Sequence, residues 1–362
     1  MMRNNIEYRK LTEVADINPS YNLTKNSKNH FIEMSAIDET SGKISYFINK
    51  TSENSGLSRF KENDILFARI TPCTENGKVA IARGLEDEVG LGSTEFIVIS
   101  PKKVLADWLY FLLKTPEIRD SAVKSMTGTT GRQRVPKEFF ETLFIQVPSL
   151  EVQRRIASNL LKVNQIHERN IHAIQLSDSY SSSLFHLTFA KEIKTRLIKD
   201  CIVKPKCKIV KIPKNKFSES GKYPIVDQGK SLIGGYTDSE ESLYNGDLPV
   251  ILFGDHTLCL KYIDFKFALG ADGVKVLTPS KEFDPKYFYY ALREVGIESR
   301  GYSRHYRYLL EEQIKVPSME LQKEFSQKMS YFEKIRETQI VTSDKLNLLL
   351  ESLSNKYFNP AN

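Results

Sequence analysis

The sequence predicts a mixed α/β protein with a pseudo-twofold internal repeat, in which two globular domains are joined by two long, antiparallel helices. Three observations support this prediction: a gapless repeat, clusters of short strand-like runs, and two long stretches without proline or glycine. Residues 145–189 align with residues 314–358 at a constant offset of 169 positions. Because repetition at a fixed period indicates a duplicated structural unit, we expect two similar domains on one frame.

The repeat extends to residue identities along both stretches. Identical residues occupy matching positions at Ile145/Ile314, Val147/Val316, Pro148/Pro317, Ser149/Ser318, Glu151/Glu320, Gln153/Gln322, Ile166/Ile335, Glu168/Glu337, Ile171/Ile340, Ser183/Ser352, Leu184/Leu353 and Phe189/Phe358. So many identities without a gap exceed what chance would give.

Each half of the chain begins with short runs of β-branched and aromatic residues bounded by turn formers, which is typical of strands. In the first half we expect strands at residues 31–37, 64–70, 78–82 and 94–99, followed by a short amphipathic helix at 108–114. The same order returns at residues 250–253, 270–279 and 287–292. The duplication therefore includes the globular parts, with looser similarity than in the helical parts.

Two stretches of about 40 residues follow Pro148 and Pro317 without a further proline or glycine, and each is expected to form a helix about 60 Å long. Apolar residues spaced three and four apart predict a coiled-coil seam on each helix. The expected seam residues are Ile156, Leu160, Val163, Ile174 and Leu184 in the first helix, and Phe325, Met329, Phe332, Leu346, Leu350 and Leu353 in the second. The matched register favours antiparallel pairing over two unrelated surface helices.

The composition indicates a cytoplasmic protein. The 362 residues carry a formal net charge of +7, from 52 Lys and Arg against 45 Asp and Glu, which permits a polyanionic partner without requiring one. The four cysteines lack the spacing of a disulfide framework or a zinc site, so no metal is expected. No signal-peptide core and no apolar run of membrane-spanning length is present, which predicts a protein without a membrane partner.

Two motifs imitate catalytic or phosphate-binding sequences. Asn18-Pro19-Ser20-Tyr21 is close to the motif with which amino-methyltransferases hold a base, but it lacks the second proline and a glycine-rich cofactor loop. Gly229-Lys230-Ser231 is like the end of a P-loop, yet Pro224 stands where that loop needs glycine. We therefore expect no catalytic residues, and the absence of an active site favours binding over catalysis.

Two basic loops at equivalent places in the repeat predict a surface that binds nucleic acid, although a solvated turn is the alternative for either loop alone. Glycines allow close approach to phosphates, hydroxyls and amides donate to phosphate oxygens, and arginines add charge and forked donors. The first loop supplies Gly128, Thr129, Thr130, Arg132, Gln133 and Arg134, and the second supplies Tyr302, Arg304, His305 and Arg307. Further candidates are Arg69, Thr71, Lys78, Ser93 and Thr94, and then Gln228, Lys230, Ser231, Asp255, His256 and Asp272.

Four segments together resemble the specificity subunit of type I restriction-modification systems. They are NGKVAIA at residues 76–82, GSTEFIVISP at 92–101, GTTGRQRVPKEFFETLFIQVPSLEVQRRI at 128–156, and GYSRHYRYLLEEQIKVPSMELQKEF at 301–325. The resemblance covers nearly the whole chain. It implies target-recognition domains at residues 1–148 and 191–317, and conserved spacer helices at 149–190 and 318–362.

The resemblance also implies a function without catalysis in this chain. Such a subunit reads a bipartite, asymmetric sequence in double-stranded DNA, with one half-site for each domain. Its implied partners are two modification (methyltransferase) subunits and the restriction (translocase and endonuclease) subunits. S-adenosylmethionine, ATP and Mg are then expected on those partners, and no cofactor is expected on this chain.

Two alternatives remain open from the sequence. One is a DNA methyltransferase or nuclease whose active site has an unfamiliar pattern, which binding of S-adenosylmethionine by the chain itself would reveal. The other is a protein scaffold that binds no DNA, for which binding would be insensitive to salt.

Overall fold

The computed structural model describes residues 7–23, 28–39, 41–51, 56–85, 89–129, 131–271, 273–299, 301 and 303–358. The chain divides into two compact units, the first made of residues 1–172 and 340–362 and the second of residues 173–339. The boundaries fall inside both long helices. Each unit therefore contains one globular part together with a segment of each helix.

The described residues of unit 1 form three small sheets and three short α-helices beside the long helices. An antiparallel sheet has the order β2-β9-β6-β7, formed by Ala15–Ile17, Phe96–Pro101, Ile65–Ala68 and Val79–Ile81. A mixed sheet has the order β4-β3-β8-β5, formed by Ile48–Thr51, Lys28–Ile32, Gly90–Gly92 and Ser58–Phe60. The third pairs β1 (Glu7–Lys10) with β10 (Phe144–Val147). The helices are α1 (Ala106–Leu113), α2 (Pro116–Lys124) and α3 (Lys137–Thr142).

Unit 2 repeats this plan with different loops. Its antiparallel sheet has the order β12-β19-β16-β17, formed by Ile202–Val203, Val274–Pro279, Val250–Gly254 and Leu260–Ile263. Its mixed sheet has the order β13-β18-β14-β15, formed by Lys211–Ile212, Ala268–Gly270, Tyr223–Val226 and Gly235–Thr237. Strand β11 (Thr195–Leu197) pairs with β20 (Gln313–Lys315), and the short helices are α5 (Pro285–Glu294) and α6 (Tyr306–Glu311).

The two antiparallel sheets match in strand order and in register. Ile65 on β6 faces Ile99 on β9, and Ile251 on β16 faces Leu277 on β19. These pairs place Arg69, directly after β6, at the position that Asp255 occupies after β16. The predicted fold class is confirmed, because both units combine β-rich parts with segments of two long paired helices.

Two expectations about local structure are wrong. The strand expected at residues 31–37 ends at Ile32, because a 3-10 turn at Met34–Ala36 turns the chain away. The helix expected at 108–114 is α1, but it is not amphipathic. Every residue from Trp108 to Leu113 is buried, since the helix packs between the antiparallel sheet and the long helices of the same unit.

The long helices are α4 (Leu150–Thr188) and α7 (Met319–Phe358). A serine begins each one: the hydroxyl of Ser149 accepts the Val152 N–H, and that of Ser318 accepts the Leu321 N–H. Serine is favoured at a helix N-cap because its oxygen satisfies an amide that has no partner within the helix. The proline before each serine closes the preceding strand.

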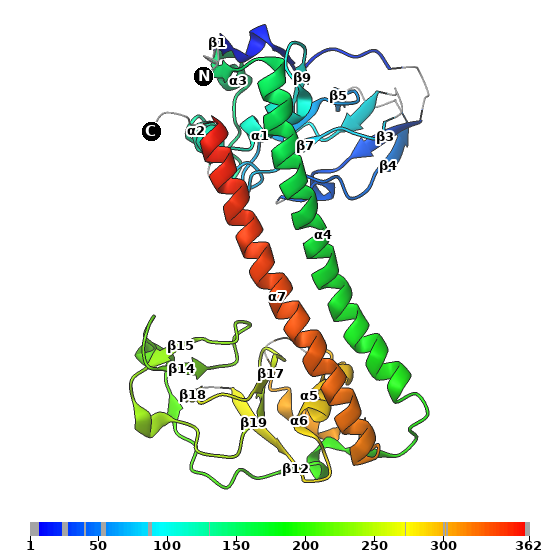
Figure 1. Cartoon of the computed structure of the whole chain (residues 1–362), viewed down its shortest axis with the longest axis vertical. Coiled ribbons are helices and arrows are strands. Elements are labelled where there is room, and N and C mark those ends of the chain that lie inside the picture. The colour runs from blue at the N-terminus through cyan, green and yellow to red at the C-terminus, as the bar shows by residue number, and fades with distance from the viewer. Residues whose placement is uncertain are drawn as a thin grey trace. The chain divides into compact units, whose positions relative to one another are not determined.

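The helices pair antiparallel within each unit, as Figure 1 shows for α4 in green and α7 in orange and red. In unit 1, the Asn159 amide on α4 donates to the Tyr357 hydroxyl on α7 at 2.9 Å. In unit 2, the rings of Tyr180 and Phe332 lie 4.6 Å apart. Early residues of α4 therefore meet late residues of α7, and late residues of α4 meet early ones.

The expected seam residues lie at these contacts, although their burial differs. Ile156, Leu160, Phe325 and Met329 are buried; Leu350 and Leu353 pack against the core of unit 1, and Leu184 and Phe332 against that of unit 2. Val163, Ile174 and Leu346 are half-buried. Polar contacts lie between the apolar parts of the seam. One of them is a hydrogen bond of 2.9 Å between the His167 ring and the Ser343 hydroxyl. Such polar contacts in a seam can fix register and orientation.

In each half of the repeat, one glutamine forms hydrogen bonds that connect a long helix to the globular part of the same unit. The buried Gln153 side chain accepts the Leu105 N–H at 2.9 Å and donates to the Pro148 carbonyl at 2.8 Å. Gln322 likewise accepts the Asp284 N–H at 2.8 Å and donates to the Pro317 carbonyl at 2.9 Å. Leu105 and Asp284 are the N-caps of α1 and α5. The identity of this residue in the repeat therefore reflects an equivalent contact in the two units.

We predict that Gln153→Ala lowers the free energy of unfolding by about 1–3 kcal/mol for each buried group that it leaves unpaired. Urea denaturation followed by circular dichroism would measure the loss. Gln175→Ala, at an exposed position of α4, is the matched control and should change stability by less than about 0.5 kcal/mol. Equal stability of the two variants would contradict a fastening role for Gln153.

Candidate nucleic-acid interface

The first basic loop packs against the end of β6. Residues 127 and 134 close it, with Thr127 N–H donating to the Arg134 carbonyl and Arg134 N–H to that of Thr127, at 3.0 and 2.9 Å. The Val135 N–H donates to the Arg69 carbonyl at 2.8 Å, and the Thr71 N–H to the Gln133 carbonyl at 3.1 Å. Four candidates from distant parts of the sequence, Arg69, Thr71, Gln133 and Arg134, therefore lie together.

The second basic loop packs in the same way against the end of β16. The His305 N–H donates to the Asp255 carbonyl at 2.9 Å, which matches the contact between Val135 and Arg69. The Asp255 carboxylate accepts the Tyr306 N–H at 2.8 Å. Because both Asp255 and His305 are buried, their side chains organise the loop and are not available to a ligand.

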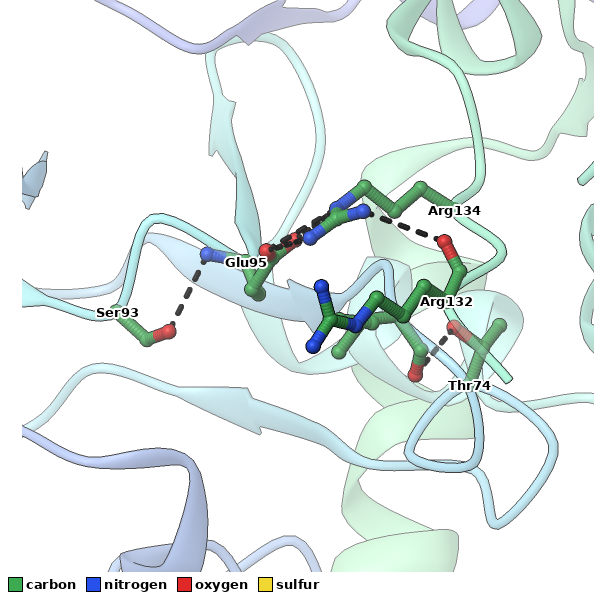
Figure 2. A network of polar contacts seen from close by, with 6 residues as sticks. Thr74, Ser93, Glu95, Arg132 and Arg134 are labelled. Carbon is green, nitrogen blue, oxygen red and sulfur yellow. Dashed lines mark hydrogen bonds and ion pairs between the residues drawn. The ribbon is translucent and has the colours of Figure 1, made fainter. Parts of the chain in front are cut away.

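Arg134 is paired within the protein. Its guanidinium donates to both carboxylate oxygens of Glu95, at distances between 2.6 and 3.1 Å, and to the Arg132 carbonyl at 3.2 Å, as Figure 2 shows. The hydrogen bonds from Arg134 hold the pKa of Glu95 below its ordinary value, although burial opposes this. Because the pKa of Glu95 is lowered, the ion pair stabilises the loop at pH values above the pKa that Glu95 has in the unfolded chain. That contribution is lost as the pH falls through the lowered value.

Arg132 differs from Arg134 because it is exposed and no side-chain contact is found for it among the described residues. Figure 2 shows its guanidinium on the same side of the loop as the ion pair of Arg134 with Glu95. The flanking glycines have positive φ values of 120° at Gly128 and 80° at Gly131, a region that side chains disfavour. The loop thus holds one arginine by an ion pair and leaves the other available.

The remaining candidates in unit 1 differ in whether contacts within the protein already occupy their side chains. The Lys78 ammonium donates to the Met34 carbonyl at 3.1 Å and lies 3.6 Å from Glu39, with only 13% of the side chain exposed. This placement argues against Lys78 as a ligand. The Thr71 hydroxyl donates to Glu75 at 2.8 Å, and the Ser93 hydroxyl accepts the Glu95 N–H at 3.2 Å. Thr94 is exposed beside them.

Arg69 lines a pocket of about 320 Å³ together with Arg59, Thr94 and the segment from Asn18 to Tyr21. The Arg69 Nε is buried and has no hydrogen-bond partner within the described parts of the chain. The Asn18 side chain accepts the Val98 N–H at 2.8 Å, so its amide oxygen is occupied by backbone. This contact agrees with the interpretation of the Asn-Pro pair as a turn.

In unit 2, a second loop contributes Gln228, Lys230 and Ser231. The Gln228 side-chain oxygen accepts the His256 N–H at 3.3 Å, and its carbonyl accepts the Thr257 hydroxyl at 2.6 Å. Lys230 and Ser231 have exposed side chains. Contacts therefore join the loop at 227–232 to the end of β16, where the second basic loop also packs.

The exposed arginines of the second basic loop are Arg304 and Arg307. The Arg307 guanidinium lies 4.6 Å from the Tyr308 ring centre, a cation–π contact. Three further candidates, Thr130, Asp272 and Tyr302, lie outside the described residues.

Sequence reasoning missed two residues that shape these loops, Glu95 and Lys261. Glu95 lies within the segment GSTEFIVISP, but an isolated glutamate does not indicate that its partner is Arg134, 39 positions away. Lys261 lies in a strand among apolar neighbours. A charged residue in such a strand could have been recognised from the sequence as unusual. The buried Lys261 side chain contacts the loop at 227–232.

The described residues contain no cluster of His, Cys, Asp or Glu able to hold a metal ion. Among the helices that are described, none combines the length and the apolar character that crossing a membrane requires.

Comparisons with known proteins show which proteins this chain is similar to in sequence and in fold. Residues 4–176 match the family model for the type I restriction modification DNA specificity domain. The chain is 37% identical over 155 residues to the type I restriction enzyme EcoAI specificity subunit of Escherichia coli, covering 41% of this chain and 26% of the relative. It is 32% identical over 200 residues to the EcoEI specificity subunit of the same organism, covering 52% and 34%. The chain thus matches about a quarter to a third of the length of these relatives.

The fold is similar to that of a solved structure along nearly the whole chain. The crystal structure of the type I restriction-modification system S subunit from M. genitalium aligns with a TM-score of 0.62 over 99% of this chain and 97% of the other, at 16% identity. The family model covers slightly less than half of this chain, and the solved structure shows a shared fold.

Proposed function

We propose that this chain selects the DNA target of a type I restriction-modification complex, with one half-site for each globular domain. The observation that carries the proposal is the repeated docking of a basic loop on the end of an equivalent strand, at Arg69 in unit 1 and Asp255 in unit 2. The backbone arrangement is the same, whereas the side chains differ. Two similar frames with unlike side chains suit two different half-sites.

Within each domain, the proposed interface consists of candidates whose side chains are available. They are Arg69, Thr94, Arg132 and Gln133 in unit 1, and Lys230, Ser231, Arg304 and Arg307 in unit 2. Arginine and lysine neutralise phosphates, and arginine and glutamine can also pair with base edges in the major groove. The loops of this surface are held by contacts with Glu95 in unit 1 and by Asp255 and His305 in unit 2.

The proposed domains are residues 1–148 and 191–317, and the proposed spacers are residues 149–190 and 318–362. Paired helices of defined register would make the separation of half-sites a property of the protein, much as dimer geometry sets half-site spacing in repressors. We propose two modification subunits as partners that methylate DNA, together with restriction subunits. S-adenosylmethionine, ATP and Mg would bind to those partners.

The proposal predicts an asymmetric, interrupted methylation motif. When the chain is co-expressed with a modification subunit with which it assembles, methylome sequencing should find two unlike half-sites separated by an unspecified spacer. Replacing the arginines of the basic loops should not change which bases are methylated elsewhere in the genome. A palindromic or continuous motif would contradict the assignment of one half-site to each domain.

Salt provides an independent measure of the same proposal. A reader that neutralises about 6–10 phosphates should lose affinity for DNA by about 10³–10⁵ between 50 and 200 mM salt. Fluorescence anisotropy of the assembled complex would measure this dependence. Affinity that does not change with salt would favour a scaffold that binds no DNA.

A further inference from the structure

A buried ammonium holds the loop at residues 227–232 from the inside. Lys261 lies on β17, and its side chain is only 6% exposed. The Nζ donates to the carbonyl oxygens of Asp227 at 2.7 Å, Ser231 at 2.5 Å and Leu232 at 3.5 Å. An ammonium has three N–H donors, so these three carbonyls satisfy it completely. The Asp227 carboxylate, 3.7 Å away, adds an opposite charge.

Other contacts close the same loop. The Asp227 carboxylate accepts the Gly229 N–H at 2.8 Å, and the Thr257 hydroxyl donates to the Gln228 carbonyl at 2.6 Å. The backbone therefore turns inward around Lys261, while the side chains of Lys230, Ser231 and Leu232 are exposed. The loop therefore presents these three side chains outward and directs the carbonyls of Asp227, Ser231 and Leu232 toward the ammonium.

This arrangement is not required by the sheet itself. Lys261 pairs with Leu252 on β16, whereas in unit 1 Ala80 pairs with Leu66 at the equivalent place on β7. Burial lowers the pKa of Lys261, and the nearby Asp227 opposes that change. Burying a charge costs free energy unless the charge is paired and hydrogen-bonded. An apolar side chain could occupy this buried strand position at a lower free-energy cost. The lysine is therefore explained by the loop that it organises.

We propose that Lys261 is a positioning residue for one DNA half-site, which sets the conformation of the loop 227–232 before DNA binds. The inference rests on the proposed function, since it assigns a role within the recognition surface of unit 2. A loop fixed in advance loses less conformational entropy on binding, which raises affinity and sharpens discrimination. Lys261 acts through Gln228, Lys230 and Ser231 and does not itself contact DNA.

The test uses the chain assembled with its modification subunits and the target found by methylome sequencing. Affinity is measured for the intact target and for two duplexes in which one or the other half-site is scrambled. Lys261→Met should reduce discrimination by about tenfold or more at one half-site, a loss of about 1.4 kcal/mol, and leave discrimination at the other half-site unchanged. The affected half-site should be the opposite of the one affected by Arg132→Ala.

A second readout separates positioning from direct phosphate contact. The dependence of affinity on salt should keep its slope in Lys261→Met, because no phosphate contact is removed, whereas loss of a phosphate-binding lysine would lower the slope by about one. Lys266→Met, which removes an exposed lysine from the same unit, is the control and should leave discrimination intact.

Three results would overturn the inference: unchanged discrimination in Lys261→Met, equal loss at both half-sites, or a reduced salt slope. Failure of the proposed function is distinguishable from these. In that case the unaltered complex would itself fail to discriminate at either half-site.

Discussion

Insertion of one helical turn into both long helices should change the length of the DNA spacer while leaving both half-sites unchanged. Four residues added between 172 and 173 and four between 339 and 340 lengthen the paired helices by about 6 Å. This increment corresponds to about two base pairs at 3.4 Å each. Methylome sequencing of cells that express the variant with its modification subunit should find the same two half-sites with a longer spacer and no methylation of the original target.

Insertion into one helix alone is the matched comparison. The helices keep register through pairs such as Asn159 with Tyr357 and His167 with Ser343 in unit 1. In unit 2, the Ser177 hydroxyl lies 3.5 Å from the Gln339 side-chain oxygen. A single insertion must break one set of these contacts, so we expect lower stability and weak methylation at any spacing. Retention of the original spacer in the double insertion would contradict the role of the helices as a ruler.

Replacing Arg132 by alanine should weaken DNA binding by about tenfold and reduce the salt slope by about one, since it removes an exposed charge from the loop. Replacing Arg134 as well should weaken binding and methylation further. The second substitution releases Glu95 from its ion pair and leaves a carboxylate near the DNA. Anisotropy titrations at several salt concentrations and methylation assays would measure these effects.

Assembly with the modification subunit should be unchanged in both variants, because both residues lie in the loop that we propose binds DNA. Arg83→Ala is a suitable control, since this exposed arginine is already paired with Asp107 at 2.6 Å. Unchanged methylation in the double variant would exclude this loop from the interface. A loss of assembly would instead indicate that the substitutions disturb the fold.

Periodic patterns allowed much of the fold to be predicted from the sequence. The gapless repeat predicted two equivalent units. The absence of proline and glycine after Pro148 and Pro317 predicted two helices from stretches of about 40 residues, and the helices in the structure have 39 and 40 residues. The error at α1 has a physical cause. Trp108 through Leu113 are all large and apolar, so a helix buried on every side was the better interpretation of that run.

The candidate site was less predictable, because chemical type alone does not say which groups are paired. Arg132 and Arg134 are identical in type, yet only Arg134 meets Glu95. Asp255, His305 and Lys78 were proposed as ligands on the same grounds, and each is instead occupied by contacts within its own unit. Such pairings depend on residues distant in sequence, and a single sequence does not encode them in any local spacing.

The division of the chain into units has a consequence for its synthesis on the ribosome. Unit 2 is a continuous stretch of chain, residues 173–339, so all of its parts are available once that stretch has emerged. Unit 1 begins first but needs residues 340–362, whose Leu350, Leu353, Tyr357 and Phe358 pack against its core. The domain that is made first is therefore completed last. During translation it exposes an apolar surface, near Trp108, Ile156 and Leu160, that the end of α7 later covers.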